Sequence, residues 1–472
     1  MIEGTSKGWA RLATALGAMN NRRVRAVGHL LTGTSATVVL SLLSITFAAR
    51  ALGPTQYGVL ALILTLGQAC ERLFSFQSWQ PLIRYGATLD PIRDCDDLRS
   101  LFKFGLMLDA MGSVAAWAAA SLFAVAGHFF FGIPWVTIEI ALVFLLSLLF
   151  NMNGTATAAF RLSGQFRMVA YLQVAVAIIR LAATLFAFAT GAGLIGFVIV
   201  WGATQALGAL LNIAFAMRLQ ASLGVASVLR ASLAGMGRRF PNVWGFTWGA
   251  NISLTIWSSA QQVDTLIVGW LADPAAAGMF HIAKRVSRVV QQVGSHVEAV
   301  VYPDLSRLWA DSRKSAFVRL LIETEIILAL FGATCFVVAL LLSRMVLEAT
   351  AGPSFGAAAP LLSIQILAVG LAISGAASRA GLLAMGRQPA VLRTVLAAAA
   401  AFYCSVAPLI EIFGAMGANI AHVLFGAIWL GGLGWSLRQG LRSSRPGAAI
   451  TEVADGGRTG RTARSSSVAP DH

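Results

Sequence analysis

Residues 280–300, FHIAKRVSRVVQQVGSHVEAV, form a mostly apolar segment with three cations near its start. On a helix that turns about 100° per residue, the polar side chains fall within an arc of about 120°, which holds His281, Lys284, Arg285, Arg288, Gln292, Ser295 and His296. Valines and an isoleucine occupy the other side. Guanidinium groups suit phosphate, because they bind it through two parallel hydrogen bonds. The pattern predicts a surface for an anionic or strongly polar ligand.

Two further segments carry polar side chains that fit this chemistry. Residues 57–79 place Gln68 and Arg72 on one side of a helix, with Glu71 next to Arg72. Arg72 is open to two roles, a ligand contact or an ion pair with Glu71. The run WSSAQQVDTLIV contributes Gln261, Gln262 and Asp264. Asp264 either binds a coupling proton or sodium ion or pairs with a cation on residues 277–301, and pairing is favoured.

The elements that carry these residues are predicted to be membrane-spanning helices. Of the 472 residues, 57% are hydrophobic and 12% are charged, and the mean hydropathy is +0.75. Soluble domains are about half apolar and a quarter charged. Runs such as IEIALVFLLSLLF recur along the chain and approach the length of about 20 residues that a bilayer requires. The predicted class is an all-α polytopic membrane protein, since helices satisfy their own backbone hydrogen bonds in lipid.

Hydrophobic runs separated by Gly, Pro and charge clusters predict twelve spans. The first six lie near 29–50, 57–79, 101–126, 135–158, 168–190 and 193–217. The second six lie near 243–271, 277–301, 316–343, 358–383, 390–410 and 414–437. The predicted parts are a basic N-terminal segment, a six-helix lobe, a cytoplasmic linker, a second six-helix lobe and a disordered tail, at 1–27, 28–220, 221–242, 243–440 and 441–472.

Positive charge predicts the orientation of these spans. Lys and Arg gather in both tails and in the connections after even-numbered spans, whereas the other connections hold little beyond Arg50 and Arg344. By the positive-inside rule, both termini are predicted to be cytoplasmic. The formal net charge of +15 is mainly a topology signal. Nucleic acid is not an expected partner, because the cations are spread over many loops.

The cations of residues 280–300 are predicted to face a water-filled cavity. A cation at the centre of the bilayer costs about 2.5–3.5 kcal/mol on the insertion scale. For Lys284 and Arg285, near the start of the span, snorkelling to outer headgroups is the alternative. Other charged residues lie nearer predicted helix ends or interfaces and are expected to be structural, namely Asp109, Glu139, Arg180, Glu323 and Glu325.

The two sets of six spans repeat at an offset of about 220 residues, the kind of self-similarity that duplication leaves. LGPTQYG contains Pro54 and Gly58, and LADPAAAG contains Pro274 and Gly278 at the same Pro-x-x-x-Gly spacing. Further pairs keep the order, namely Pro81 with Pro303, Gly164 with Gly386, and Gly193 and Gly196 with Gly414 and Gly417. With an even number of spans in each half, the halves are predicted to be parallel repeats around a central cavity. That arrangement predicts a transporter.

Several of these segments together resemble one family. The first span ends in FAARALGPTQYGVLAL, a weaker echo GWLADPAAAGMFHIAKRV follows the seventh span, YPDLSRL follows the eighth, and spans six and twelve open with glycines. Over residues 28–440 the chain resembles the polysaccharide flippases, the O-antigen-type and exopolysaccharide lipid-carrier flippases of the multidrug/oligosaccharidyl-lipid/polysaccharide exporter superfamily.

The resemblance implies a V-shaped pair of lobes with spans one, two, seven and eight lining the cavity. It also implies transfer of an undecaprenyl-diphosphate-linked oligosaccharide from the cytoplasmic to the outer leaflet of a bacterial inner membrane. The pathway's polymerase and export machinery are implied partners besides the lipid bilayer. No cofactor is expected. Whether a proton gradient or a sodium gradient supplies energy for transport is left open.

The candidate residues fall into two sets. Arg72, Lys284, Arg285 and Arg288 match by position and type the cations that hold diphosphate or acidic sugars in this family. With their polar neighbours Gln68, His281 and Gln292, they form the predicted substrate-binding set. Asp264 and Glu71 form the predicted ion-coupling or charge-pairing set.

Two other function classes fit parts of the sequence. A cation-coupled drug exporter of the same superfamily shares the span pattern, but cavities for cationic drugs favour acidic and aromatic linings. A membrane glycosyltransferase or polymerase is suggested by RDCDD, in which Asp94, Asp96 and Asp97 resemble a metal-binding DxD, although a solvated charge cluster is favoured. The chain has no P-loop, its four cysteines are isolated, and no nucleophile–base pair is defensible. We expect a transporter rather than an enzyme, with no catalytic residues and no metal site.

Overall fold

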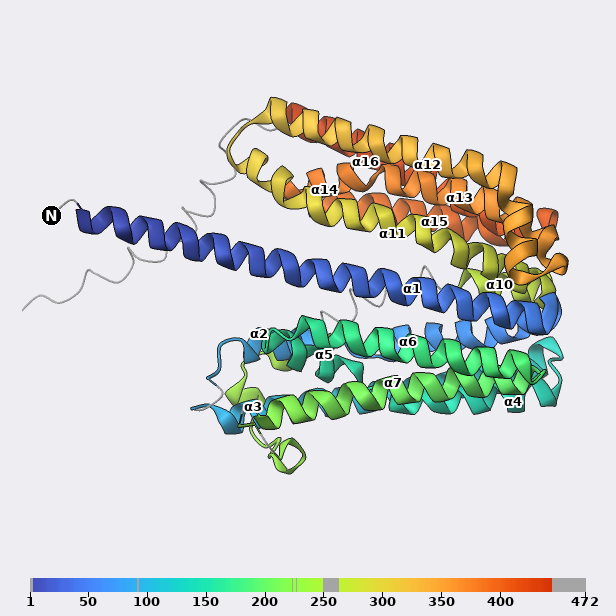
Figure 1. Ribbon diagram of the computed structural model, residues 1–472. Helices are drawn as coiled ribbons and strands as arrows, with labels where there is room; N and C mark the ends of the chain where they lie inside the picture. The colour runs from blue at the N-terminus through green and yellow to red at the C-terminus, as the bar shows by residue number, and fades with distance from the viewer. Residues whose placement is uncertain (1–2, 91–92, 223, 226, 249–262, 444–472) are drawn as a thin grey trace, which may run out of the picture. The chain divides into compact units, whose positions relative to one another are not determined.

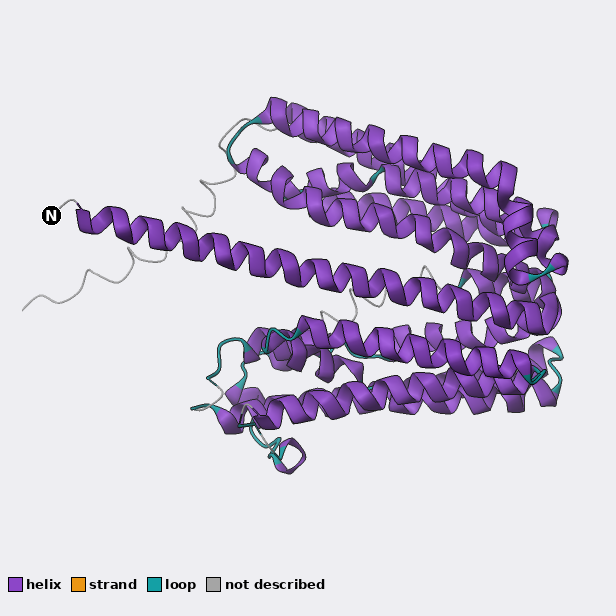
Figure 2. Cartoon of the chain, in the orientation of Figure 1, coloured by secondary structure: helices purple, strands orange, loops and turns teal. Residues whose placement is uncertain are grey.

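The computed structural model shows a chain of helices joined by short loops (Figure 2). The structure describes residues 3–90, 93–222, 224–225, 227–248 and 263–443, and of residues 3–34, Phe131 and Phe166 it describes the backbone only. Within these ranges no strand is present. The predicted all-α polytopic class is confirmed. The predicted disordered tail lies outside the described residues from position 444 onward.

The helices follow the hydrophobic runs of the sequence (Figure 1). The first half contains α1 (Glu3–Phe74), α2 (Trp79–Gly86), α3 (Cys95–Phe131), α4 (Trp135–Leu145), η1 (Leu146–Phe150), α5 (Asn153–Leu162), α6 (Phe166–Ala189), α7 (Leu194–Ser222), η2 (Val228–Arg230) and α8 (Met236–Arg239). The second half contains α10 (Asp264–Leu271), α11 (Pro274–Ala310), α12 (Lys314–Ala351), η3 (Pro353–Ala358), α13 (Ala359–Ser374), α14 (Ala376–Ala384), α15 (Gln388–Phe413) and α16 (Ala415–Ser443).

The chain packs as two compact units, each built from segments distant in sequence. The first unit comprises Met1–Val289, Leu340–Leu362 and Val406–Ala418. The second unit comprises Val290–Ala339, Ser363–Ser405 and Asn419–His472. The lobe boundaries derived from the sequence stay a prediction.

Within the described residues, nine helical stretches are long and apolar enough to cross a membrane. Predicted spans one and two form a single stretch, because α1 runs through a kink at Gly53, whose φ is +68°, followed by Pro54. Helix α11 is not among the nine, since its polar stripe makes it less apolar. Of predicted span seven, 243–271, residues 249–262 lie outside the described residues, and α10 covers its last part.

Predicted span four is broken at residues 151–152, between η1 and α5. Asp109 of α3 lies at this break and accepts two hydrogen bonds of 2.7 Å from the Thr155 amide and hydroxyl and one of 2.5 Å from the Ser78 hydroxyl. These bonds satisfy donors at the start of α5 that have no partner inside that helix. Gly154 permits the approach, because a Cβ there would lie 2.0 Å from Ser78 Oγ. Asp109 is a structural residue at a helix break.

The second unit contains a matching arrangement around Glu325 of α12. Predicted span ten is interrupted at Gly375, between α13 and α14. Glu325 accepts a hydrogen bond from Ser378, the third residue of α14, as Asp109 does from Thr155, the third residue of α5. Both the carboxylates and their hydroxyl donors are separated in the chain by nearly the offset of the repeat. The duplication therefore extends to hydrogen bonds between helices.

The two Pro-x-x-x-Gly motifs contact each other in the first unit. A Cβ at Gly58 would lie 1.6 Å from the Pro274 carbonyl oxygen, and a Cβ at Gly278 would lie 2.6 Å from the Pro54 carbonyl oxygen. The contact is reciprocal, as expected when equivalent segments pack about a local two-fold axis. The absence of side chains at the two glycines lets α1 approach the start of α11 at backbone distance.

Part of the predicted cytoplasmic linker packs on the first unit. The Lys103 ammonium donates to the Ala231 carbonyl at 2.6 Å, and the Tyr85 hydroxyl donates to the Pro241 carbonyl at 2.8 Å. Apolar residues of the segment are buried in one cluster with side chains of α2, α3 and α5, namely Val228, Met236, Phe240 and Val243. Residues 227–248 are thus attached to the first unit by both polar and apolar contacts.

Candidate functional site: a cationic cluster on α1, α6 and α11

The predicted polar stripe lies on α11, where its first residues are enclosed by protein. Phe280, Ile282 and Ala283 have no exposed surface, and His281 is 4% exposed. Lys284, Arg285 and Arg288 are half-buried. The apolar side of the helix is covered at this level, so the three cations lie inside the first unit beside residues of α1 and α10.

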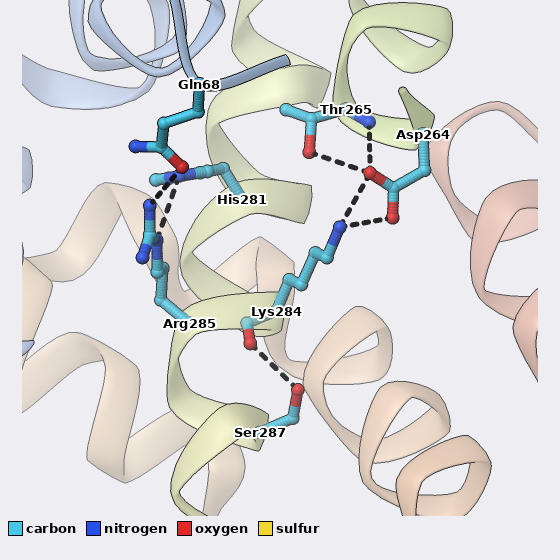
Figure 3. Close-up of polar contacts among 7 residues, drawn as sticks. All are labelled: Gln68, Asp264, Thr265, His281, Lys284, Arg285 and Ser287. Carbon is cyan, nitrogen blue, oxygen red and sulfur yellow. Dashed lines mark hydrogen bonds and ion pairs between the residues drawn. The ribbon is translucent and has the colours of Figure 1, made fainter. Parts of the chain in front are cut away.

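Lys284 forms an ion pair with Asp264, which begins α10 (Figure 3). The Lys284 Nζ lies 2.6 Å from Oδ1 and 2.5 Å from Oδ2 of Asp264. The Asp264 side chain is 1% exposed and also accepts the Thr265 amide at 2.7 Å. A buried carboxylate keeps its charge when a cation and an amide donor face it. Of the two roles left open for Asp264, pairing is the one present here.

Arg285 points toward Gln68 and His281 (Figure 3). Its Nε donates to His281 Nε2 at 3.2 Å, and its Nη2 donates to Gln68 Oε1 at 3.4 Å. Gln68 comes from α1, 217 residues earlier in the chain. The other ring nitrogen of His281, Nδ1, lies 2.7 Å from the Tyr57 hydroxyl. Arg285 is therefore held by side chains of α1 and of its own helix.

Three more guanidinium groups act on this region. Arg288 lies one turn beyond Arg285, and the charges of Arg72 on α1 and Arg180 on α6 also repel Arg285. Arg180 is held by a hydrogen bond of 2.9 Å from its Nε to the Thr204 hydroxyl on α7. Arg72, Arg180, Lys284, Arg285 and Arg288 are called the cationic cluster below.

The cationic cluster has a large excess of positive charge. The charge of Asp264 acts on both Lys284 and Arg288. No carboxylate of the described chain acts in the same way on Arg285. Cations held close together in a low-dielectric region repel one another strongly. An anion bound among them would relieve this repulsion, so the arrangement favours anionic ligands.

Arg72 and Glu71 do not form an ion pair with each other in the described part of the chain. The Glu71 carboxylate is half-buried and binds the Asn151 side chain instead. Arg72 is exposed. The two residues point to different surroundings, as expected for neighbours about 100° apart on a helix. Arg72 is therefore available to a ligand.

Equivalent positions of the repeat carry exchanged residue types. The offset that relates Pro54 to Pro274 also relates Gln68 to Arg288 and Arg72 to Gln292. At each of the two positions, one half of the chain supplies an arginine and the other supplies a glutamine. Gln292 is half-buried on α11, one turn beyond Arg288.

Two residues of this site were not assigned to it from the sequence. Arg180 was expected to be structural, yet it belongs to the cationic cluster. Its signal was a lone arginine in the middle of the apolar run AVAIIRLAATLF. Tyr57 was noted only as part of the LGPTQYG motif, and no pattern in the sequence links it to His281.

The remaining candidate residues are Gln261, Gln262 and those of the RDCDD run. Gln261 and Gln262 lie outside the described residues. Asp96 of RDCDD is 89% exposed and pairs with Arg99, and Asp97 pairs with Arg239 at 3.6 Å. No group of three metal-binding side chains occurs in the residues that the structure describes. The RDCDD run is a solvated charge cluster at the start of α3.

Sequence comparisons identify a family and a relative of this chain. A family described as "Polysaccharide biosynthesis protein" matches residues 47–360, which is more than half of the chain. The inner membrane protein YghQ of Escherichia coli (strain K12) is 23% identical over 273 residues, which cover 58% of this chain and 77% of that protein. The family match spans both Pro-x-x-x-Gly motifs and the cationic cluster.

Solved transporter structures share the fold. The lipid II flippase MurJ, in an inward closed conformation, aligns with a TM-score of 0.66 and 14% identity over 88% of this chain and 89% of that chain. A multidrug resistance MATE family transporter of the MOP superfamily, in an inward-facing conformation, aligns with a TM-score of 0.65 and 11% identity over 87% of this chain and 96% of that chain. At these identities the likeness concerns the fold alone. The family resemblance expected from the sequence is confirmed, and this chain belongs to the polysaccharide biosynthesis protein family.

Proposed function

We propose that this protein is a flippase for a polyprenyl-diphosphate-linked oligosaccharide. It moves this cargo from the cytoplasmic to the outer leaflet by alternating access, for surface polysaccharide biosynthesis. The observation that carries the proposal is the cationic cluster, in which the charges of Arg288, Arg180 and Arg72 act on Arg285 and Lys284 is paired with Asp264. A diphosphate offers the charge and the geometry that guanidinium groups bind best.

Each cation has a different part in this proposal. Lys284 is largely neutralised by Asp264, so it contributes mainly to holding α10 against α11. Arg72 and Arg288 make no ion pair within the described chain. They are the residues that exchange water for phosphate oxygens when the headgroup arrives. The prenyl tail stays in lipid while the headgroup is bound.

The membrane potential favours the proposed direction of transport. With the interior negative, moving a negative charge outward is favourable by about 2.3 kcal/mol per charge per 100 mV. This gain is realised if the cations of α11 stay in place while the anion moves. A proton or sodium gradient is then an additional source of energy, with Asp264 and Glu71 as the acidic residues nearest the cluster.

The proposed setting is a bacterial inner membrane with both termini in the cytoplasm. The excess of Lys and Arg in even-numbered connections supports this orientation. The partners that fit the proposed cargo are the polymerase and export machinery of the same pathway.

Arg288→Ala tests the proposed cargo site. We expect a loss of flipping of about tenfold to a hundredfold, because hydrogen bonds to charged groups contribute about 1.5–3 kcal/mol. The measurement is leaflet-resolved transport of a labelled undecaprenyl-diphosphate oligosaccharide in proteoliposomes. Arg307→Ala is the matched control on the same helix, since Arg307 is 76% exposed and pairs only with Asp304 at 3.5 Å. Equal transport by both variants would remove Arg288 from the site.

A cation-coupled multidrug exporter is the second candidate, favoured by the fold shared with a MATE transporter. The two functions predict opposite ligand charge. A cationic dye in the same proteoliposomes would be exported by a drug exporter. The cationic cluster predicts no export of the dye, because its charges repel a cation.

A further inference from the structure

Tyr57 and His281 form a buried pair beside Arg285. Tyr57 is 1% exposed and His281 is 4% exposed. The Tyr57 hydroxyl lies 2.7 Å from His281 Nδ1, and Arg285 Nε lies 3.2 Å from His281 Nε2. The imidazole thus lies between a phenol of α1 and a guanidinium one turn along α11. Tyr57 also packs edge-on against Phe355 at a ring distance of 5.8 Å.

The donor at one end determines the protonation of the ring. An arginine Nε always carries its hydrogen and always donates, so His281 Nε2 must accept. A neutral imidazole that accepts at Nε2 carries its hydrogen at Nδ1. His281 Nδ1 therefore donates to the Tyr57 oxygen. The chain of hydrogen bonds runs from Arg285 to His281 and on to Tyr57.

This chain orients one particular edge of the guanidinium group. A guanidinium has two edges that bind anions in a bidentate manner, one formed by Nε with one Nη and one formed by both Nη atoms. His281 and Gln68 occupy Nε and Nη2. Nη1 makes no hydrogen bond to the described residues. The edge formed by Nη1 and Nη2 is left for a ligand.

The chain of hydrogen bonds from Arg285 through His281 to Tyr57, called the relay below, does not follow from the duplication of the motif alone. At the offset that relates Pro54 to Pro274, the positions equivalent to Tyr57, His281 and Arg285 hold Ala277, Ala61 and Thr65. Duplication alone would give both halves the same pair. Tyr57, His281 and Arg285 form hydrogen bonds with one another, and the equivalent alanines Ala277 and Ala61 cannot form such bonds through their side chains.

We propose that Tyr57 and His281 are positioning residues that hold Arg285 with its Nη1–Nη2 edge toward an anionic headgroup. This inference rests on the proposed function for the identity of the headgroup. Without the Tyr57 oxygen, the hydrogen on His281 Nδ1 loses its acceptor. Either that hydrogen stays buried without a partner, or it moves to Nε2 and opposes the hydrogen of Arg285 Nε. Only the second outcome removes the acceptor of Arg285 Nε and releases Arg285, and relief of the unpartnered buried donor favours that outcome.

The first experiment measures the protonation state and the tautomer of His281 by ¹⁵N NMR and needs no ligand. The full-length chain, labelled with ¹⁵N-histidine and placed in lipid nanodiscs, contains six histidines. The signals of His281 are those that disappear in His281→Gln. We expect a neutral ring with its hydrogen on Nδ1 in the native chain, and a changed state in Tyr57→Phe. An imidazolium, or a hydrogen on Nε2, in the native chain would overturn the relay.

The second experiment measures the dissociation constant of farnesyl diphosphate, with farnesol as the uncharged comparison. Tyr57→Phe keeps the ring packing and is expected to weaken farnesyl diphosphate binding about tenfold, the effect of losing one charge-assisted hydrogen bond. Tyr171→Phe is the matched control, because Tyr171 is 63% exposed on α6. In an Arg285→Ala background, Tyr57→Phe is expected to have no further effect.

The outcomes separate this inference from the proposed function. Equal losses on Tyr57→Phe with and without Arg285 would show that Tyr57 acts on the fold and not through Arg285. If the native chain binds farnesyl diphosphate no better than farnesol, the diphosphate cargo is wrong, and the ¹⁵N spectrum still decides the relay. If Tyr57→Phe reduces the amount of folded protein, the ¹⁵N spectrum of the native chain alone decides whether the relay exists.

Discussion

The buried charges of this protein differ in what balances them. Asp264 and Lys284 balance each other at 2.5 Å with little exposure on either side. Arg285 is held by neutral acceptors, and the charges of both Asp264 and Arg72 act on Arg288. Neutral acceptors fix the position of a guanidinium without cancelling its charge. Asp264 and Lys284 therefore form a structural ion pair, whereas Arg285 and Arg288 are the cations proposed to meet an anion.

Neutralising one member of the ion pair should destabilise the protein more than neutralising both. Asp264→Asn and Lys284→Gln each leave one buried charge without a partner, at a cost of about 3 kcal/mol or more. The double variant removes both charges and is expected to recover most of the loss. Thermal unfolding in nanodiscs gives the three values.

An exposed ion pair on α12 is the control for this comparison. Arg319 and Glu323 are 80% and 54% exposed and lie 2.7 Å apart. Arg319→Gln and Glu323→Gln should leave the unfolding free energy nearly unchanged, because solvent screens an exposed ion pair. A double Asp264/Lys284 variant no more stable than the single ones would show that the buried pair is not the dominant interaction at this position.

Helix contacts at backbone distance set the arrangement of the site elements. The kink at Gly53 and Pro54 and the reciprocal approach at Gly58 and Gly278 hold α1 against the start of α11. This contact brings Gln68 and Tyr57 within reach of residues of α11, which comes much later in the chain. The helix breaks beside Asp109 and Glu325 are a second pair of equivalent features, and the two carboxylates accept hydrogen bonds from buried residues in the first turns of α5 and α14.

Gly58→Ala is expected to be severely destabilising. The added methyl group would lie 1.6 Å from the Pro274 carbonyl oxygen, and backbone cannot move aside as a side chain can. A cost of about 3 kcal/mol or more is expected for such overpacking. Gly431→Ala on α16 is the control, since no atom lies within 4 Å of its added Cβ and alanine favours a helix by up to about 1 kcal/mol. A Gly58→Ala protein as stable as Gly431→Ala would contradict the close contact.

At the scale of the whole molecule, the chain is a polytopic helical protein whose two halves carry related sequence features. Helix breaks, motif glycines and exchanged Gln and Arg positions recur at the offset of the repeat. The family match and the shared transporter fold agree with this organisation. The halves differ in α11, where Lys284 and Arg285 stand at the positions equivalent to Leu64 and Thr65.

The predicted orientation has a direct test by cysteine labelling from one side of the membrane. The four native cysteines are first replaced by serine. Thr190→Cys, exposed in the connection after span five, should react with an impermeant maleimide added outside the cell. Gln165→Cys, exposed after span four, should react only after the membrane is permeabilised. The reverse pattern would invert the proposed topology.

Local patterns in the sequence determined the helices, the membrane class, the repeat and the polar stripe of α11. These features depend on hydropathy and on the helical period, which neighbouring residues encode without reference to the rest of the chain. The stripe was therefore predicted residue by residue from His281 to Gln292. The helix breaks at residues 151–152 and at Gly375 were not, because tertiary hydrogen bonds to Asp109 and Glu325 stabilise them.

The tertiary structure alone decided which side chains meet. It paired Lys284 with Asp264, attached Arg285 to Gln68 and His281, and added Arg180 and Tyr57 to the site. Such choices depend on which helix faces lie together and at what distance, and these follow from packing at a few glycines rather than from periodicity. The sequence by itself thus predicted a cationic helix in a membrane protein, and contacts with α1 and α10 decided which neighbours surround Lys284 and Arg285.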